Sequence, residues 1–279
     1  MEKKPVSLTK LEKQFIKTVW DFYHLNGRHD LPWRKTKDPY KIVVSELMLQ
    51  QTQVARVLPK YKEFLKKFPT VSSLAPAPLG EVLKAWQGLG YNRRAKFLWQ
   101  AAKAVVNEHK GKWPNTYTQL QTLPGIGSYT AGAVMNFAYN SPVALIETNV
   151  RTVHIHHFFK DAENISDKEL LPIIERTLDE TNPREWNWAL MDYGSHLKTT
   201  VGNASKKSKA YKKQSNFKES NRYIRGAILR ALTQQPYTEA ALCSHFHDIE
   251  NERIKLQLDA LKNDGLVVKQ KYKFLLPTK

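Results

Sequence analysis

Cysteine is almost absent from this sequence of 279 residues, which contains only Cys243. One thiol cannot form an internal disulfide or supply a four-cysteine zinc or iron–sulfur site. Long apolar runs are missing too. No stretch reaches the ~18 apolar residues of a membrane-spanning helix, and the first residues, MEKKPVS, lack the apolar region of a secretory signal. We therefore expect a cytoplasmic protein without a metal cluster or a membrane partner.

Acidic residues are also in short supply. Asp and Glu number 26 against 44 Lys and Arg, which gives a net charge of +18. Residues 198–279 carry a net +10 and residues 1–197 a net +8, so the excess is spread along the chain. This balance predicts a polyanionic partner, most commonly nucleic acid, and hence a place at the nucleoid. The alternative is a basic surface that only aids solubility.

Helical periodicity dominates the first 197 residues. Apolar spacing predicts helices over 8–23, 42–57, 61–68, 92–106, 116–123, 129–137, 150–159, 167–178 and 184–197, with short helices over 72–74 and 78–83. Pro59 is expected to end the second of these helices and to restart the chain. The sequence thus predicts a mainly α-helical protein.

The remaining residues change in character. Residues 198–222 hold eight basic residues and one acid with few large apolar ones, which predicts a basic linker, either a solvated tether or a DNA-contacting loop. Helices over 223–232, 239–246 and 250–263 and a hairpin over 266–276 then predict a winged-helix-like α+β domain at 223–279. Its third helix carries Arg253 and Lys255 and could enter a DNA groove, although such units also serve as protein contacts.

A tight turn joins two of the predicted helices, in Leu123-Pro-Gly-Ile-Gly-Ser-Tyr-Thr-Ala131. Gly125 and Gly127 allow the turn, and the next helix begins near Ser128. Backbone N–H groups at such a helix start bind anions, so this helix–hairpin–helix is predicted to grip a DNA phosphate.

Five motifs in the same order make the resemblance specific. They are Leu31-Pro-Trp-Arg34, Pro39-Tyr40, Ser45-Glu-Leu-Met-Leu-Gln-Gln-Thr52, Gly88-Leu-Gly-Tyr91 and Leu123-Pro-Gly-Ile-Gly127. Over residues 8–197 the chain resembles the helix–hairpin–helix DNA glycosylases, and among them those that remove adenine mispaired with 8-oxoguanine. The resemblance implies a two-lobed domain at 1–197, with a six-helix lobe at about 30–140 and a second lobe from 1–29 and 141–197.

Glu46 lies within the apolar run from Val43 to Leu49, where a carboxylate is costly to bury unless it has a function. The alternative is an exposed glutamate on a helix surface. Burial would favour the protonated form, which can donate a proton. The resemblance implies that Glu46 is the general acid that protonates the leaving adenine.

The resemblance also implies a second carboxylate that stabilises the sugar cation, with an asparagine that orients it. Relatives place an aspartate there, whereas this chain has Glu147 in Glu147-Thr-Asn-Val-Arg151, and Asn149 matches the asparagine. The extra methylene moves the charge, and a shift of ~1 Å can cost about a hundredfold in rate. A structural alternative is that Glu147 only caps the helix that follows.

Tyr129 occupies the position where strand-cleaving relatives have a lysine that forms a Schiff base. Tyrosine cannot form one, so we expect a monofunctional glycosylase. Gln51 and Tyr91 match residues that enter the duplex where the base is removed. Arg93, Arg94 and Ser128 are further candidates for DNA contact.

Three features of the relatives concern their cofactors and their C-terminal domain. They usually carry an iron–sulfur cluster just after the position of Leu197, which this chain cannot build, and a C-terminal domain that reads 8-oxoguanine, which a winged-helix-like unit replaces. Their hairpin carbonyls can hold a monovalent cation, for which Gly125 and Gly127 are candidates.

His154, His156 and His157 do not share one helix face, so we favour packing or backbone contacts over a metal site.

The sequence therefore predicts a monomeric enzyme that excises adenine opposite guanine or 8-oxoguanine in double-stranded DNA. One alternative is a glycosylase that removes thymine or uracil opposite guanine, because it would share the scaffold and Tyr129. A second alternative is a non-catalytic DNA-binding protein that uses its C-terminal unit.

Overall fold

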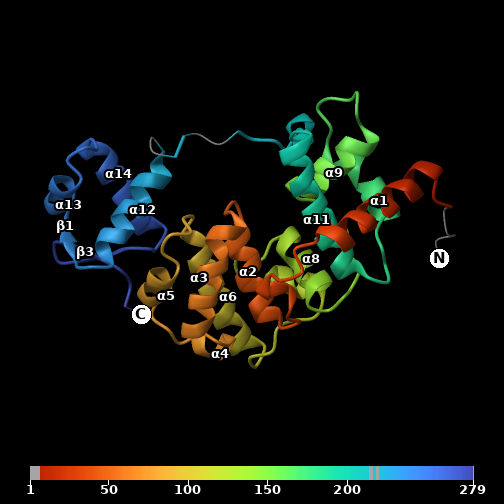
Figure 1. Ribbon diagram of the computed structural model, residues 1–279. Coiled ribbons are helices and arrows are strands. Elements are labelled where there is room, and N and C mark those ends of the chain that lie inside the picture. Colours follow the sequence, from red (N-terminus) through yellow and green to blue (C-terminus); the bar gives the residue numbers. More distant parts are fainter. Residues whose placement is uncertain (1–6, 214–215, 218–219, 279) are drawn as a thin grey trace. The chain divides into compact units, whose positions relative to one another are not determined.

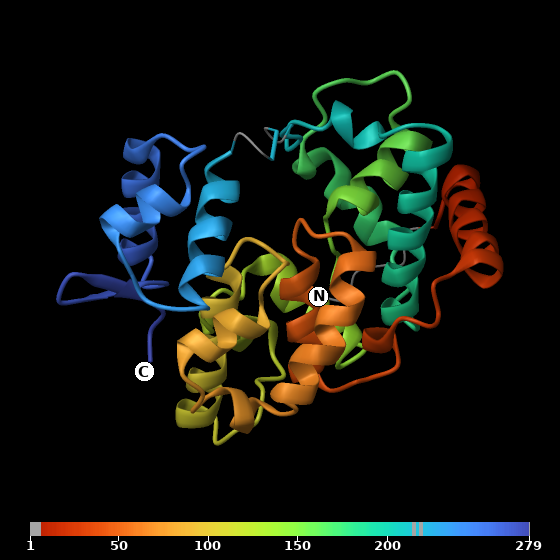
Figure 2. The same ribbon diagram turned by 60° about the vertical axis from the view of Figure 1, so that its left-hand side comes forward.

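The computed structural model describes residues 7–213, 216–217 and 220–278, which are mainly helical with one small sheet, as predicted (Figures 1 and 2). The chain divides into two compact units. The first unit is residues 1–39, 115–117 and 127–213, and the second is 40–114, 118–126 and 214–279. The C-terminal residues that the sequence sets apart as a domain thus belong with the second unit.

The first unit is built around two long helices that pack on each other. Figure 1 shows α11 beside both α1 and α9, and Phe15 and Trp186 are among the side chains of its core. The elements of this unit are α1 (Lys10–Asn26), the 3₁₀ turn η1 (Pro32–Arg34), α8 (Ser128–Phe137), α9 (Thr148–Phe158), α10 (Asp167–Arg176), α11 (Pro183–Thr200) and the 3₁₀ turn η2 (Ala204–Lys207).

A buried aspartate explains one of the sequence motifs. Asp192 of α11 accepts two hydrogen bonds from the guanidinium of Arg34, at 2.7 and 2.8 Å, and further ones from the backbone N–H and Nε of Arg28. These bonds lower the pKa of Asp192, although burial alone would raise it. The arginine of Leu31-Pro-Trp-Arg34 therefore fixes the connection after α1 to α11 through a bidentate ion pair.

The histidines of α9 have packing contacts. His154 is fully buried, with Nδ1 2.9 Å from the carbonyl of Val150 and its ring against Phe15. His157 Nε2 lies 3.0 Å from the hydroxyl of Tyr193. Within the described residues, no group of three His, Cys, Asp or Glu side chains is arranged to hold a metal ion.

The helical part of the second unit departs from prediction at two points. The helix predicted over 42–57 is two helices, α2 (Pro39–Leu49) and α3 (Val54–Lys67), because the backbone turns left-handed at Gln51. Pro59 lies inside α3 and does not interrupt it, so the predicted restart is wrong. The other helices of this part are α4 (Val71–Leu74), α5 (Leu79–Ala85), α6 (Arg93–Glu108) and α7 (Tyr117–Thr122).

The C-terminal elements follow the order of a winged helix. They are α12 (Asn221–Leu232), β1 (Tyr237–Thr238), α13 (Glu239–His245), α14 (Asn251–Asn263), β2 (Val268–Gln270) and β3 (Lys273–Leu275). The predicted hairpin is present as β2 and β3, with Lys269 opposite Phe274. The sequence missed β1, a two-residue strand that pairs with β3 and ends at the N-cap of α13.

Two contacts join these elements to the helices of their own unit. The Asp264 side chain pairs with Arg93 of α6 and Arg225 of α12, and its carbonyl accepts a hydrogen bond from Lys96. The backbone N–H of Gly80 donates to the carbonyl of Pro277 at 2.8 Å, where a side chain at position 80 would clash. The winged-helix elements are thus part of the second unit's fold.

The stretch predicted as a linker over 198–222 is largely structured. α11 continues to Thr200, η2 follows, and Ser208 forms a parallel bridge with Ile165. Asn203 caps η2, and its side chain also accepts a hydrogen bond from Thr152 of α9. Residues 214–215 and 218–219 of the predicted linker lie outside the described residues.

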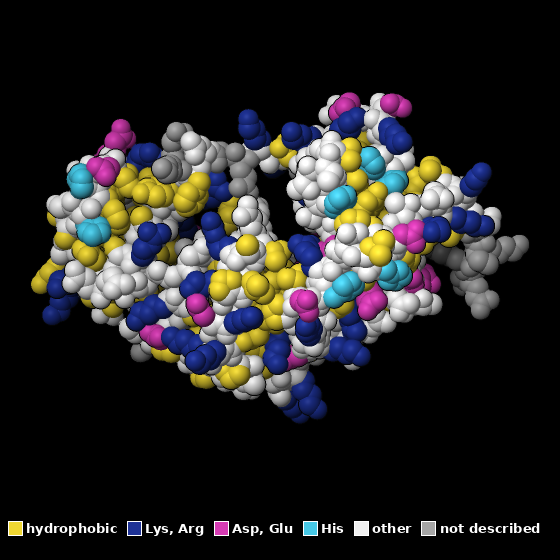
Figure 3. Space-filling model, viewed as in Figure 1, with side chains coloured by type: hydrophobic (Ala, Val, Ile, Leu, Met, Phe, Trp, Pro, Cys, Tyr) yellow, Lys and Arg dark blue, Asp and Glu magenta, His cyan; other side chains and the backbone are white. Residues whose placement is uncertain are grey.

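Lys and Arg side chains are spread over the face in Figure 3 and outnumber Asp and Glu there. Among the helices of the described chain, none combines the length and the apolar character that crossing a bilayer requires.

We predict that His154 makes the protein less stable in acid. Burial lowers the pKa of His154 from 6.5 to about 4. Between these pH values the unfolded chain binds a proton that the folded chain does not, so the free energy of unfolding falls as pH falls. The shift corresponds to a contribution of about 3 kcal/mol to the difference in the free energy of unfolding between pH 7 and pH 4. Urea unfolding at the two pH values measures that difference. His154→Gln should lose this part of the pH dependence, and the same change at the exposed His247 should not. An unchanged pH slope in His154→Gln would contradict the prediction.

Candidate functional site

The predicted helix–hairpin–helix is present, formed by α7, the turn at 123–127 and α8. Gly125 has a φ of 75°, and a Cβ there would lie 2.4 Å from Cβ of Phe97, so only glycine fits. Gly127 is the N-cap of α8, makes no side-chain cap, and is exposed together with Ser128. Gly127 offers no side chain to cap the start of α8, an arrangement that suits an anion such as a phosphate.

The hairpin also presents backbone carbonyl groups. The carbonyl of Leu123 accepts one hydrogen bond, from Ile126 N–H at 3.1 Å, and the carbonyl of Gly127 accepts one, from Ala131 N–H at 2.9 Å. Each carbonyl oxygen keeps a second lone pair, and oxygen is the ligand type that hard cations prefer.

Glu147 is the N-cap of α9, in the first unit. Its Oε1 accepts the backbone N–H groups of Asn149 and Val150, at 2.7 and 2.8 Å. Its Oε2 accepts the hydroxyl of Thr148 at 3.1 Å and the side-chain amide of Asn149 at 3.3 Å. The capping alternative for Glu147 is therefore realised in the structure. Capping also holds the carboxylate in one orientation, with four donors that suit its ionised form.

Asn149 links Glu147 to a residue that sequence analysis missed. The side-chain oxygen of Asn149 accepts a hydrogen bond from Nζ of Lys198, in α11, at 2.8 Å. Burial lowers the pKa of Lys198, and the charge of Glu147 counteracts this effect. Tyr129, also in the first unit, lies half-buried in the first turn of α8.

Glu46 lies in the second unit, in the middle of α2. Its side chain is buried, with 6% of its surface exposed, as the apolar run around it predicted. Its neighbours along the helix, from Ile42 to Met48, are buried as well. A buried carboxyl group of this kind is held away from bulk water, as a proton donor in a base pocket requires.

Arg94 does not have the surface position that a DNA-contacting residue needs. It is 6% exposed, and its guanidinium donates to the carbonyls of Leu47 and Met48 at the end of α2 and of Gln50 just after it. The same group donates to the hydroxyl of Thr52 and to the carbonyls of Leu89, Gly90 and Tyr91 before α6. Burial lowers its pKa to about 10, so it stays charged at neutral pH. We therefore assign Arg94 to holding two loops together.

The two loops that Arg94 holds carry the predicted wedge residues. Gln51 and Tyr91 both have left-handed backbones, with φ of 52° and 46°. Such conformations cost non-glycine residues about 1–3 kcal/mol and persist only where the surroundings impose them. The hydrogen bonds from Arg94 to residues on both sides of Gln51, and to the carbonyl of Tyr91, supply that constraint.

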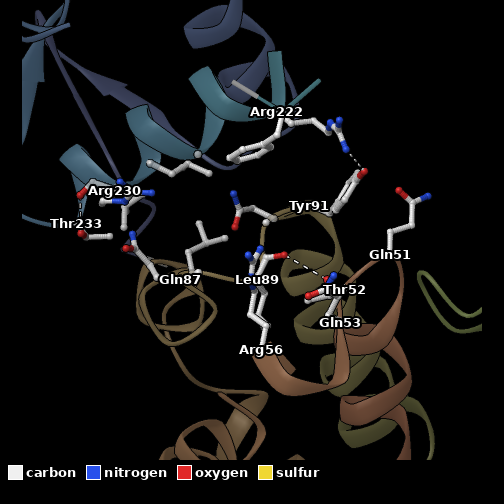
Figure 4. Close-up of a pocket in the computed structure, with 18 residues that line it drawn as sticks. Gln51, Thr52, Gln53, Arg56, Gln87, Leu89, Tyr91, Arg222, Arg230 and Thr233 are labelled. Atoms are coloured by element: carbon white, nitrogen blue, oxygen red, sulfur yellow. Dashed lines mark hydrogen bonds between the residues drawn. The ribbon is translucent and has the colours of Figure 1, made fainter. Parts of the chain in front are cut away.

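A pocket lies beside the two wedge residues, and residues of α12 form part of its wall (Figure 4). Its volume is about 420 Å³, within the usual range for ligand pockets. Arg222 donates from Nη1 to the hydroxyl of Tyr91 at 2.7 Å and covers its ring. None of the described residues that line the pocket is acidic, and its polar members include Gln51, Thr52, Gln53, Arg56, Gln87, Tyr91, Arg222, Arg230 and Thr233. The lining favours a ligand that offers hydrogen-bond acceptors or negative charge.

Sequence analysis missed Arg222 and Arg230, which it treated as the end of a linker and as part of a helix face. The excess of basic residues after Leu197 could have pointed to them. Only the position of α12 in the structure shows that these two arginines line the pocket. Arg93, predicted to contact DNA, is exposed and pairs with Asp264 at 3.7 Å.

Comparisons with known proteins agree with this geometry. Residues 44–181 match the model of the HhH-GPD superfamily of base excision DNA repair proteins. The adenine DNA glycosylase of Mycolicibacterium smegmatis is 34% identical over 261 residues, which cover 87% of this chain and 89% of that protein. The chain belongs to the HhH-GPD superfamily.

Other superfamily members support the same assignment. The adenine DNA glycosylase of Buchnera aphidicola subsp. Baizongia pistaciae is 38% identical over 185 residues, 65% of this chain and 52% of that protein. The chain spans about half the length of the first such relatives. The structure of a thermostable thymine-DNA glycosylase matches with a TM-score of 0.60 at 31% identity, over 67% of this chain and 87% of that one.

We predict that Arg94→Lys destabilises this HhH-GPD protein by about 3 kcal/mol, because one ammonium group cannot replace the planar guanidinium that serves both loops. Urea unfolding at pH 7 measures the change. Arg93→Lys is the matched control, since the neighbouring arginine is exposed, and it should change stability by less than about 0.5 kcal/mol. Equal effects of the two substitutions would show that the loops do not depend on Arg94.

Proposed function

We propose that this protein is a monofunctional DNA glycosylase that excises adenine opposite guanine or 8-oxoguanine from double-stranded DNA, acting as a monomer at the nucleoid. The observation that carries the proposal is the contrast between two carboxyl groups: Glu46, in the second unit, is buried in an apolar helix, and Glu147, in the first unit, is held by four hydrogen-bond donors. One suits a proton donor and the other a fixed negative charge. Excision of a purine needs both.

The proposed reaction breaks the bond between C1′ of the sugar and N9 of adenine. Glu46 donates a proton to the extruded base, which leaves as neutral adenine. The bond electrons stay on the base, and the sugar becomes oxocarbenium-like. Glu147, oriented by Asn149, stabilises this cation until water adds at C1′ and loses a proton. Tyr129 lines the site and offers no amine, so the DNA strand stays intact.

We further propose how the protein holds its substrate. The N–H groups at the start of α8, near Gly127 and Ser128, bind a DNA phosphate, and Gly125 allows the turn that presents them. A monovalent cation at the carbonyls of the hairpin, for which Gly125 and Gly127 are the candidates, would add positive charge beside that phosphate. Gln51 and Tyr91 enter the duplex, because their rigid loops project the side chains that fill the space of the extruded base.

The pocket of Figure 4 is proposed to receive the base that adenine leaves behind. It begins at Gln51 and Tyr91, and its arginine and glutamine side chains suit the acceptor-rich edge of a guanine-type base. In this role the winged-helix elements take the place of the 8-oxoguanine-reading domain that the adenine glycosylases resembling this chain usually carry.

A second candidate is removal of thymine opposite guanine. The similarity to a thymine-DNA glycosylase structure favours it. A pyrimidine leaving group does not need a proton on a purine ring, so this function leaves the buried Glu46 without its proposed task. A panel of mismatched duplexes, assayed for released base, decides between the two. Release of thymine or uracil, without adenine, would replace the first proposal.

We predict that Glu46→Gln slows excision of adenine by at least about 100-fold, because the amide cannot donate the proton. Single-turnover assays on duplexes with adenine opposite 8-oxoguanine measure the rate, and titration of the same duplex measures affinity, which should stay within about twofold. Glu63→Gln, on the exposed surface of α3, is the control and should excise at the native rate. Normal excision by Glu46→Gln would remove Glu46 from the mechanism.

We predict that Gly226→Phe erases discrimination between opposite bases. Gly226 lines the pocket from α12, and a Cβ there meets nothing within 4 Å, so the ring can occupy the pocket without displacing the helix. The ratio of excision rates opposite 8-oxoguanine and opposite cytosine should fall by about 10-fold or more. Gly226→Ala should keep the native ratio. Adenine opposite an abasic site should be excised equally by all three proteins, and an unchanged ratio in Gly226→Phe would exclude the pocket.

A further inference from the structure

Lys198 of α11 reaches Asn149 of α9 at a place where the two helices are closely packed. A side chain on Gly194 would place its Cβ 2.5 Å from the carbonyl oxygen of Asn149 and 2.6 Å from its Cβ, so glycine is required there. Lys198 follows Gly194 by four residues and therefore projects from the same face of α11. The close contact at Gly194 brings the ammonium group of Lys198 to the side chain of Asn149.

The hydrogen bond from Lys198 decides which way the Asn149 side chain faces. An ammonium group can only donate, so it requires the oxygen of the amide, and the bond of 2.8 Å is to Oδ1. The amide nitrogen is then left to face Glu147, where it donates to Oε2 at 3.3 Å. A rotated amide would present two donors to the ammonium group and an acceptor to the carboxylate. Both contacts would be lost.

The chain holds Lys198 from both sides. α11 continues through Lys198 to Thr200, and the segment after it returns to α9, where the side-chain oxygen of Asn203 accepts the hydroxyl of Thr152. Lys198 is about half-buried, so the surrounding water and salt screen its charge less than that of a surface lysine. It is thus a fixed positive charge at the end of a row that runs from Lys198 to Asn149 to Glu147.

We propose that Lys198 is a positioning residue for the excision reaction, which acts through Asn149 to hold the carboxylate of Glu147 against the sugar. The inference rests on the proposed function. It also gives this chain a reason to keep activity with a glutamate at position 147. A longer side chain has more rotamers to restrict, and Lys198 restricts them by locking Asn149.

The test is a set of single-turnover excision rates at saturating enzyme, on a duplex with adenine opposite 8-oxoguanine. Lys198→Met keeps the length of the side chain and removes the donor, and its rate should fall about 10- to 100-fold. Lys198→Arg, which can still donate to Oδ1, should recover most of the rate. In an Asn149→Ala background, Lys198→Met should have no further effect, because the residue through which Lys198 acts is gone.

Affinity for the duplex separates positioning from simple DNA contact. Lys198→Met should keep the native dissociation constant within about twofold and the native dependence on salt. Lys206→Met, on the exposed surface of η2, is the matched lysine control and should keep the native excision rate. Thermal unfolding of each variant confirms that it is folded.

Three outcomes would overturn the inference. The first is a native excision rate in Lys198→Met, or a double variant in which Lys198→Met slows Asn149→Ala as strongly as it slows the native protein. The second is a loss confined to affinity, with the slope of log affinity against log salt reduced by about 0.9, which would make Lys198 a phosphate contact. The third is the absence of base release by the native protein from every mismatched duplex. That result removes the proposed function itself, whereas the first two leave it intact.

Discussion

One buried guanidinium holds together two loops of the second unit. Arg94 donates to residues on both sides of Gln51 and to the carbonyl of Tyr91, and both of these residues have left-handed backbones. Neither loop could keep such a conformation alone, because each costs about 1–3 kcal/mol. Removal of the guanidinium would leave several buried carbonyls without donors as well. The rigid presentation of the two side chains therefore depends on a residue that never needs to touch DNA.

This dependence explains where prediction from the sequence failed. The periodicity of residues 42–57 is helical throughout, so it could not reveal the break at Gln51 that separates α2 from α3. Arg94 looked like a surface cation because arginine usually is one. Its burial follows from two loops that are 40 residues apart in the sequence. By contrast, the burial of Glu46 was predictable, since the apolar residues that surround it are its neighbours on one helix.

The same distinction between local and distant contacts holds around Glu147. Its hydrogen bonds from the N–H groups of Asn149 and Val150 lie within one turn of helix, so the sequence could offer the cap as an alternative, while the resemblance implied that Asn149 orients the carboxylate. Lys198 comes from another helix, 49 residues further on, at a position that the resemblance marked only as the start of a missing cluster. The contacts of the segment after Lys198, a hydrogen bond from Thr152 to Asn203 and a backbone bridge between Ile165 and Ser208, could not be read from a basic, polar stretch.

The C-terminal elements show how a common fold acquires a specific task. The order of helices and strands is that of a winged helix, and the sequence predicted it, but the order alone does not say which surface works. In this chain α14 mixes the acidic residues Glu252 and Asp259 with the basic residues Arg253, Lys255 and Lys262, whereas α12 has three arginines and no acidic residue. Arg222 and Arg230 of α12 line the pocket beside Tyr91, and Asp264 pairs with Arg93 of α6 and Arg225 of α12. The charges thus favour α12 over α14 as the helix that meets the substrate. The winged-helix elements then act by completing a surface of the second unit, and their contribution depends on the docking at Asp264 and Gly80.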